Sequence, residues 1–327
     1  MKTGSEIRNG AQHANAACSC ITLDQEMLVK ILDENAGSEG FGVSLAASHP
    51  YLFANSPVFM SLETMAAMKA IVEAVEAAVA LPQFRAAALE WAPDISAADF
   101  GPAGALMGYD FHLTESGPVL IEVNTNAGGA FLNAILAKAQ RVCCFEAGLG
   151  IDPSRPKQDF DIEIVAMFES EWKHQRRSGC PAVIAIVDDE PETQHLYPEL
   201  LLAKAVLEKN GFSVIIADPK TLVVSDDGLS VDGVHIDLVY NRLVDFTLDE
   251  PDHRALRNAY LHGKVVVTPN PHVHAMFADK RNLALLSDAP LLAQAGLVAG
   301  EAKILKSAVP KTVLVTGVNA DALWADR

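Results

Sequence analysis

Three oxygen-bearing side chains have a spacing that could bind a metal ion. Asp110 lies in one apolar run, and Glu122 and Asn124 are two residues apart in the next, residues 119–124. Alternate residues of a strand point to the same face, so Glu122 and Asn124 could converge with Asp110. Hard cations such as Mg²⁺ take oxygen ligands and complete their shell with water and substrate phosphates. A solvated hairpin edge, whose polar side chains simply face water, accounts for the same spacing.

A β-hairpin would position these side chains. Apart from these side chains and His112, residues 109–113 and 119–124 are apolar, and a polar turn containing Glu-Ser-Gly separates the two runs. Asn126 to Gly129 break the second strand, and residues 130–144 predict a helix. Upstream, apolar residues recur every three or four positions from Leu62 to Val79, which predicts a helix with a core-facing stripe that ends before Pro82. A shorter helix is expected over residues 84–91.

The composition changes at residues 178–179, where we expect a second unit to begin. A β-branched run at 183–187, a helix over 195–210 and an apolar run at 212–217 predict a parallel βαβ unit. Further strands are expected at 221–225 and 229–231, which would form a hairpin, and at 238–240 and 265–268. Helices are expected over 163–176 and 252–262. The second half therefore predicts an α/β sheet.

Arg242 follows the buried strand predicted at residues 238–240. Ligands of α/β sheets commonly bind at the carboxyl ends of strands, which favours a substrate role for Arg242. A structural salt bridge to Asp245 or Asp249 is the alternative, and both interpretations stay open. The acidic turn that begins at Asp188 lacks the glycines of a dinucleotide-binding turn, so a Rossmann-type oxidoreductase is disfavoured. A role of this turn in binding a substrate amine is retained.

Two other groups of metal-ligand types are weaker candidates. His272, His274 and Asp279 lie close in sequence, but imidazoles on a short loop beside a lysine are poorly arranged for a metal. Cys18 and Cys20 have no second pair at zinc-finger spacing. The five cysteines are irregularly spaced, so we expect reduced thiols rather than a disulfide framework.

The composition limits the classes of protein. The 327 residues, 50% of them hydrophobic, can bury one large or two moderate cores. The net charge of −17 argues against a broad nucleic-acid or anionic-membrane surface, so a polyanion would need a focused site. No apolar stretch reaches the ~18 residues of a membrane span, and we expect a cytoplasmic protein.

The hairpin segment resembles the metal-binding strand pair of ATP-grasp ligases, the superfamily of glutathione synthetase. The similarity lies in Asp110, then a turn, then Leu-Ile-Glu-Val-Asn-x-Asn-x-Gly-Gly ending at Gly129. It implies that Asp110, Glu122 and Asn124 hold Mg²⁺ bridging ATP phosphates. It also implies that the loop with Asn126 and Gly128 lies near an acyl phosphate and contributes to cofactor binding.

A second block, from residue 183 to Lys280, resembles the substrate domain of the same superfamily. The resemblance implies that Lys280 contacts an ATP phosphate, and that residues 310–316 form the strand entering the ATP-binding lobe. Because this block follows the hairpin, the resemblance is to circularly permuted ATP-grasp proteins. It implies an incomplete permuted ATP-grasp of α/β class, because a second ATP-binding lysine and a glycine-rich phosphate loop are lacking.

The expected organisation is therefore a helical region with the metal-binding lobe (residues 1–177), a Rossmann-like substrate domain (178–309) and the start of an absent nucleotide-binding lobe (310–327). The expected function is an ATP- and Mg²⁺-dependent carboxylate–amine ligase that acts through an acyl phosphate, with Arg242 as the catalytic candidate. The expected partners are small carboxylate and amine substrates, with a homodimer left open and neither nucleic acid nor membrane involved. A non-catalytic remnant that binds a small ligand or a partner is the alternative.

Overall fold

The computed structural model describes residues 11, 13, 15, 16, 23–139 and 159–325. The chain forms two compact units whose segments interleave in sequence. Unit 1 comprises Met1–Glu63, Ala98–Leu106 and Asn126–Asn270; unit 2 comprises Thr64–Ala97, Met107–Thr125 and Pro271–Arg327. The sequence-based division at residues 178 and 310 follows consecutive segments and stays a prediction.

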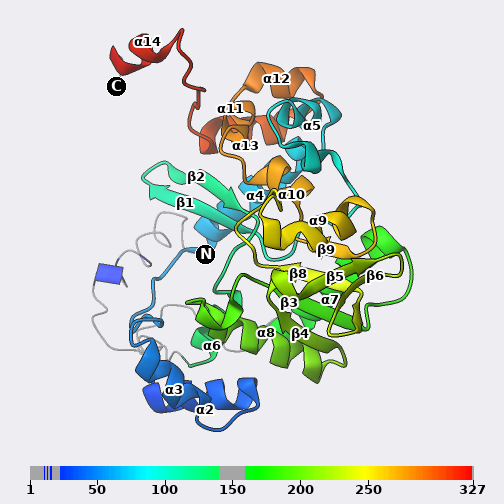
Figure 1. The fold of residues 1–327 in the computed structure, drawn as a ribbon. Coiled ribbons are helices and arrows are strands. Elements are labelled where there is room, and N and C mark those ends of the chain that lie inside the picture. The colour runs from blue at the N-terminus through cyan, green and yellow to red at the C-terminus, as the bar shows by residue number, and fades with distance from the viewer. Residues whose placement is uncertain (1–10, 12, 14, 17–22, 140–158, 326–327) are drawn as a thin grey trace. The chain divides into compact units, whose positions relative to one another are not determined.

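A four-stranded parallel sheet forms the centre of unit 1 (Figure 1). Its strands are β3 (Val183–Val187), β4 (Ser213–Ala217), β8 (Leu238–Asn241) and β9 (Val266–Thr268), in the order β4-β3-β8-β9. Helix α8 (Tyr197–Lys209) connects β3 to β4 and ends before Gly211, whose φ of 94° suits a residue without a side chain. The predicted parallel βαβ unit is confirmed.

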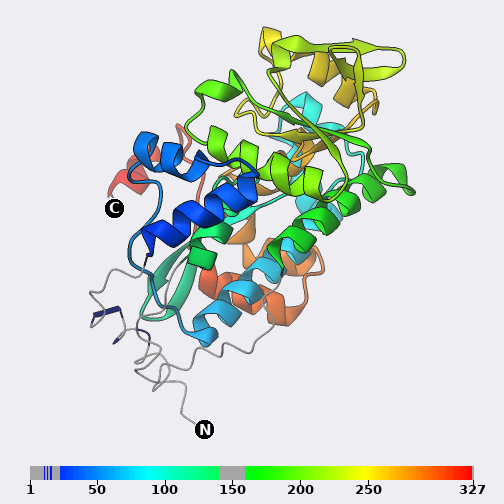
Figure 2. The same cartoon turned by 90° about the horizontal axis from the view of Figure 1, so that it is seen from below.

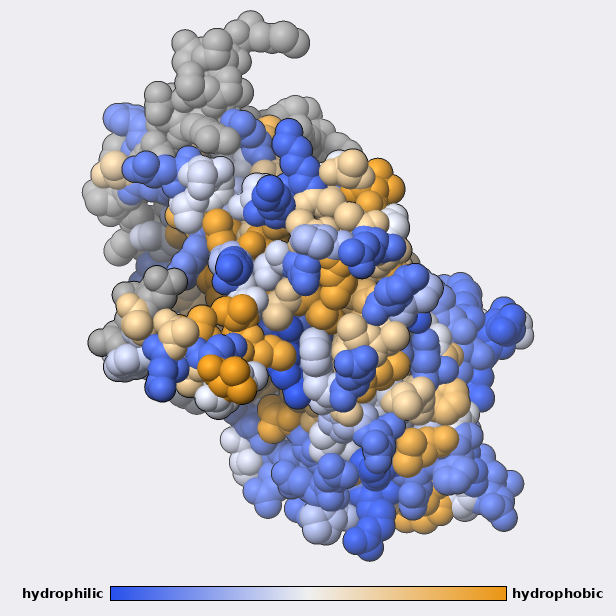
Figure 3. All heavy atoms as spheres, turned by 90° about the horizontal axis from the view of Figure 1, so that it is seen from above, coloured by the Kyte–Doolittle hydropathy of each residue, from blue (hydrophilic) through white to orange (hydrophobic). Residues whose placement is uncertain are grey.

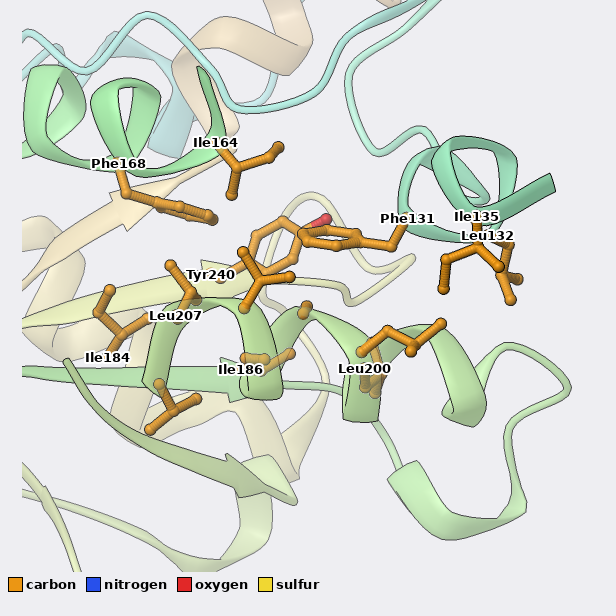
Figure 4. Close-up of a cluster of buried hydrophobic side chains, with 14 of the residues drawn as sticks. Phe131, Leu132, Ile135, Ile164, Phe168, Ile184, Ile186, Leu200, Leu207 and Tyr240 are labelled. Carbon is orange, nitrogen blue, oxygen red and sulfur yellow. The ribbon is translucent and has the colours of Figure 1, made fainter. Parts of the chain in front are cut away.

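Helices α2 (Gln25–Ala36), α6 (Ala130–Ala139), α7 (Phe160–Arg176) and α8 contribute to one buried core with this sheet (Figures 2 and 4). Alternate residues of β3, Ala185 and Val187, are buried on the opposite face. Burial on both faces explains why the strands of this parallel sheet are continuously apolar in sequence. The core side chains labelled in Figure 4 are Phe131, Leu132, Ile135, Ile164, Phe168, Ile184, Ile186, Leu200, Leu207 and Tyr240.

Short elements complete unit 1. An antiparallel sheet contains β5 (Leu222–Ser225), β6 (Gly228–Val231) and β7 (Val234–Ile236), which confirms the predicted hairpin and adds a third strand. Helix α9 (Arg254–Leu261) packs against β5 and β6. The other elements are α3 (Phe41–Ser48) and the 3-10 helices η3 (Pro191–Thr193), η4 (Pro219–Thr221) and η5 (Pro251–His253).

Unit 2 is a β-hairpin packed with helices. The hairpin consists of β1 (Gly108–Thr114) and β2 (Gly117–Asn124), as the sequence predicts. Leu120 and Val123 join Ile71, Phe84 and Leu305 in a second buried core. The helical elements are α4 (Leu62–Val79), α5 (Pro82–Leu89), η1 (Asp94–Ala97), α10 (Pro271–Phe277), α11 (Asn282–Leu286), α12 (Ala289–Gln294), α13 (Ala299–Ala308) and α14 (Ala320–Ala325).

Two sequence-based expectations are corrected. The apolar stripe of α4 is buried only toward its carboxyl end, because Leu62 and Met65 are 64% and 50% exposed. Residues 310–316 form no strand in the structure, and Val313 and Val315 are exposed. A strand needs a neighbour to accept and donate its backbone hydrogen bonds, and the part of the chain that the structure describes pairs no strand with this segment. The prediction of a helix over residues 130–144 is met by α6 as far as Ala139, and residues 140–144 lie outside the described residues.

Figure 3 shows hydrophobic residues interspersed with hydrophilic ones on one face of the molecule. Among the described residues, none of the helices combines the length and the hydropathy that a bilayer crossing requires. Cys180 is an exposed free thiol. The other four cysteines, Cys18, Cys20, Cys143 and Cys144, lie outside the described residues.

Buried Glu171 of α7 ties two other segments of unit 1 together. Its carboxylate accepts hydrogen bonds from the backbone N–H groups of Ala103 (3.0 Å) and Gly104 (2.9 Å) and from the Thr268 hydroxyl (2.5 Å). Replacement by alanine would leave three donors, one of them the buried Thr268 hydroxyl, without their acceptor. We expect Glu171→Ala to lower the free energy of unfolding in urea by about 3 kcal/mol.

Glu169→Ala is the matched control, because Glu169 lies on the same helix in an exposed pair with Lys173 (3.1 Å). An exposed i, i+4 pair contributes only ~0.3–0.5 kcal/mol. Equal destabilisation by the two substitutions would show that Glu171 does not anchor these segments.

Candidate functional site

The carboxylates of Asp110 and Glu122 face each other in unit 2. Asp110 pairs with Glu122 in the antiparallel register of β1 and β2. Directly opposed like charges destabilise a strand pair unless a cation lies beside them. Asn124, the third predicted ligand, is exposed at the end of β2 and lies two residues beyond Glu122. The structure therefore brings the two predicted carboxylates together, with an amide on the same strand.

A β-bulge turns these side chains away from the core. Asp110 pairs with Glu122, but the next residue, Phe111, pairs with Leu120, so Ile121 is an extra residue in β2. Without it, alternation would place Leu120 on the face of Glu122. The extra residue leaves Leu120 buried and Ile121 exposed. The bulge thus lets one short strand contribute both to the core and to a polar face.

Lys280 neutralises this pair in the structure. Its Nζ lies 2.7 Å from Glu122 Oε2, although the lysine side chain is 75% exposed. The hydrogen bond and charge of Lys280 lower the pKa of Glu122; burial opposes the shift, and the Asp110 carboxyl group adds a hydrogen bond. Glu122 in turn raises the pKa of Lys280. The predicted phosphate-binding lysine and a predicted metal ligand are therefore direct partners.

A second group of predicted residues lies in unit 1, at the carboxyl ends of β3 and β8. Strand β3 has β4 on one side and β8 on the other, which makes the β3–β8 boundary a topological switch point, where open α/β sheets bind ligands. Arg242 follows β8, and its backbone N–H donates to the carbonyl of Val187 at 2.8 Å. The sheet thus positions Arg242 where a ligand site is expected.

Arg242 is only 9% exposed and forms no ion pair with the carboxylates that the structure describes. Its Nη1 donates to the carbonyl of Ala127 (3.1 Å) and to the hydroxyl of Tyr240 (3.4 Å). The predicted alternative, a salt bridge to Asp245 or Asp249, is wrong: these carboxylates pair with His253 and Arg257 instead. A buried guanidinium without a paired anion is costly unless an anion binds.

The loop with Asn126 and Gly128 contacts this arginine, 116 residues away in sequence. Asn126 Nδ2 donates to the carbonyls of Arg242 (2.9 Å) and Leu243 (3.0 Å). A Cβ on Gly128 would lie 3.3 Å from Arg242 Nη2 and 2.6 Å from Leu196 Cδ1. The structure therefore joins three predicted residues, Asn126, Gly128 and Arg242, in one cluster.

Two acids complete the cluster. Burial raises the pKa of Asp188 to about 6, although the Asp189 N–H group and Arg242 oppose the shift. Burial also raises the pKa of Glu199, against the influence of Arg242 and of N–H groups at the start of α6. Sequence reasoning retained Asp188 only as part of an acidic turn and missed Glu199. The single feature of the sequence that could have indicated Glu199 is its position directly before the apolar run of α8.

The weaker metal candidate of the sequence does not assemble. His272 Nδ1 lies 2.7 Å from the carbonyl oxygen of Ser96, while His274 Nδ1 lies 3.1 Å from the Thr125 hydroxyl. Burial lowers the pKa of His274 to about 4, and Asp279 opposes this shift. In the described ranges, no three His, Cys, Asp or Glu residues are grouped to hold a metal. The Asp110–Glu122 pair would need the Asn124 amide as its third protein donor.

Comparison with known proteins supports the fold. No family model matches the chain, and no curated protein sequence matches it. Among solved structures, it is similar to the apo form of a glutathione synthetase-like effector (GSS30) from Globodera pallida, with a TM-score of 0.54 and 13% identity. The match covers 88% of this chain and 71% of the effector chain. The protein thus has a mixed α/β fold of the glutathione synthetase-like type.

The close packing around Gly128 can be tested by adding one methyl group. Gly128→Ala must displace Leu196 and crowd the Arg242 guanidinium. We expect a loss of about 1–2 kcal/mol in the free energy of unfolding, measured by urea denaturation.

Gly300→Ala is the control, because a Cβ on this glycine of α13 would meet nothing within 4 Å. Alanine is the better helix former, so this variant should be neutral or stabilised by up to ~1 kcal/mol. A neutral Gly128→Ala would contradict the close approach of the loop to Arg242.

Proposed function

We propose that the protein is an ATP-dependent carboxylate–amine ligase that requires Mg²⁺. The observation that carries this proposal is the opposed pair of Asp110 and Glu122, with Lys280 against it. The glutathione synthetase-like fold supports the proposal by analogy alone. In the proposed reaction, the substrate carboxylate attacks the γ-phosphorus of ATP and releases ADP. An amine then attacks the acyl carbon, releases phosphate and loses a proton.

The donor set fits a magnesium ion. Asp110, Glu122 and Asn124 offer only oxygen ligands, and the Lys280 ammonium already marks where a positive charge is stabilised. A bound Mg²⁺ would neutralise charge on the phosphate oxygens. Release of Lys280 from Glu122 would free its ammonium to bind a phosphate, which suits an exposed side chain on a flexible stem. Asp110 and Glu122 would hold the ion, and Asn124 would complete the protein ligands.

The Arg242 cluster would bind the substrate carboxylate and orient it. The guanidinium is held by the Ala127 carbonyl and the Tyr240 hydroxyl, so little conformational entropy remains to be lost on binding. Asn126 fixes the backbone of the loop, and Gly128 leaves room beside Arg242. Asp188 is a candidate for the amine or for its proton, because a carboxyl group with a pKa of about 6 can exchange protons near neutral pH.

The order of the segments is the basis for a further part of this proposal. The hairpin with Asp110 and Glu122 precedes the parallel sheet in the chain, whereas ordinary ATP-grasp ligases have the reverse order. We propose that the chain is a circularly permuted relative of these ligases.

Binding without turnover is the second candidate. The observation that favours it is again the Lys280–Glu122 ion pair, because each partner neutralises the charge of the other. A scaffold of this kind could bind a small ligand through Arg242 alone. The two candidates differ in whether ADP is released when a carboxylate and an amine are both present.

Removal of the Lys280 ammonium should affect the binding of metal and the binding of nucleotide in opposite ways. We expect Lys280→Ala to bind Mn²⁺ about two- to fivefold more tightly, because a competing cation is removed. The same variant should bind MgATP at least about tenfold more weakly, because a phosphate contact is lost. Glu122→Gln should weaken both. Electron paramagnetic resonance measures Mn²⁺ binding, and calorimetry measures MgATP binding.

Lys306→Ala and Glu115→Gln are the matched controls, because both residues are exposed, on α13 and on the hairpin turn. They should bind like the wild type. MgATP binding that is absent, or equal in all variants, would refute the site. ADP release with mixed amino acids and polyamines would support the ligase, whereas MgATP binding without ADP release would favour the binding module.

A further inference from the structure

His253, at the end of η5, joins two loops of unit 1 through both ring nitrogens. Its side chain is 0% exposed. Nδ1 lies 2.8 Å from Asp245 Oδ2, and Nε2 lies 2.9 Å from Asp189 Oδ1. Sequence reasoning gave no reason to single out this histidine. Its two partners lie 56 residues apart in the chain, so only the fold brings them to one ring.

The hydrogen-bond chemistry requires a doubly protonated ring. A neutral imidazole donates from only one nitrogen, whereas each carboxylate oxygen accepts. Asp245 also accepts from the Thr247 N–H (3.1 Å) and hydroxyl (2.7 Å) and from the Glu250 N–H (3.0 Å). Burial alone would raise the pKa of Asp245, but these donors and His253 together lower it to about 2. Asp245 is therefore an anion, and His253 Nδ1 must carry a proton.

The two loops flank the switch point. Asp189 comes directly after Asp188 at the end of β3, and its N–H donates to the Asp188 carboxylate at 3.0 Å. Gln194 Nε2 donates to the Asp189 carbonyl at 2.6 Å. Asp245 lies three residues after Arg242 in the loop that follows β8. The His253 ring thus connects the loop that carries half-buried Asp188 to the loop that carries buried Arg242.

We propose that His253 is a positioning residue for this site: its imidazolium holds the loop after β3 to the loop after β8 and so fixes Asp188 relative to Arg242. Only the identity of the positioned site depends on the proposed ligase function. The bridge itself consists of two charge-assisted hydrogen bonds in a buried place, where such bonds are strongest.

Two other charged side chains on the elements packed against η5, Lys220 and Arg257, are paired with acids. Helix η4 packs against η5 and carries Lys220, which pairs with Asp218 at 2.7 Å. Helix α9 carries Arg257, which pairs with Asp249 at 2.9 Å. Asp189 and Asp245 are therefore the charges that act on the ring directly.

The pH dependence follows from the direction of the pKa shift. Burial acts to lower the pKa of His253, but the hydrogen bonds and charges of Asp189 and Asp245 outweigh it and raise the pKa above 6.5. The folded protein therefore retains this proton at a pH where the unfolded chain has lost it. The bridge contributes its full stabilisation of the folded state below pH 6.5, and this stabilisation is lost as pH rises through the raised pKa of His253.

The test combines histidine-labelled NMR with hydrogen exchange on the full chain, without nucleotide. In a pH titration, His253 should keep the protons on both nitrogens to a higher pH than a histidine of the unfolded chain, because its pKa is raised above 6.5. Above the His253 pKa, the backbone amides of residues 188–194 and 242–250 should exchange roughly tenfold faster after correction for intrinsic rates. In His253→Gln, these amides should exchange rapidly at every pH.

His262→Gln is the control and should leave the exchange profile unchanged. Asp189→Asn keeps the His253 imidazole and removes one of the two charges that raise its pKa, so the faster amide exchange should begin at a lower pH. This variant tests the bridge even if His253→Gln does not fold. A His253 ring that loses its second proton at or below pH 6.5, or a profile that Asp189→Asn does not move, would overturn the proposal. These outcomes do not depend on ATP binding, so a failed ligase assay would leave them unaffected.

Discussion

Two carboxylates held face to face across an antiparallel strand pair repel each other, and the candidate cation site of unit 2 depends on how that repulsion is relieved. In the structure, Lys280 relieves it by approaching Glu122 to 2.7 Å. Opposed carboxylates favour a cation beside them, and we propose that a divalent metal ion can take the place of this ammonium. The bulge at Ile121 makes the arrangement compatible with folding, because it directs Glu122 outward while Leu120 and Val123 stay in the core.

The cluster in unit 1 presents the opposite problem, a buried cation without a paired anion. Arg242 is stabilised by a carbonyl, a hydroxyl and an aromatic ring 5.4 Å from its guanidinium carbon, and each compensates only part of the lost hydration. Asp188 and Glu199 act on it electrostatically but do not form ion pairs with it. In the proposed ligase this cation would bind the substrate carboxylate, while His253 fixes the loops on either side.

Local patterns in the sequence predicted much of the fold. The apolar runs around the Glu-Ser-Gly turn predicted the hairpin, and the alternation of β3, α8 and β4 predicted the parallel sheet. The bulge was not predictable, because one extra residue is decided by pairing between strands and leaves no mark on composition. The contact of Asn126 with Arg242 and the bridge through His253 join distant segments, so no local pattern could indicate them. For residues 310–316 the local pattern predicted a strand that the structure does not contain. Their β-branched residues favour a strand, but among the described residues no neighbouring strand pairs with them.

The central claim is that Asp110 and Glu122 form a cation site whose occupant can change. Anomalous diffraction from crystals grown with Mn²⁺ tests it most directly. The account predicts an anomalous peak within about 2.0–2.6 Å of oxygen atoms of both carboxylates, with the Lys280 ammonium displaced from Glu122. No peak there, with Lys280 still paired to Glu122 at saturating Mn²⁺, would contradict the account.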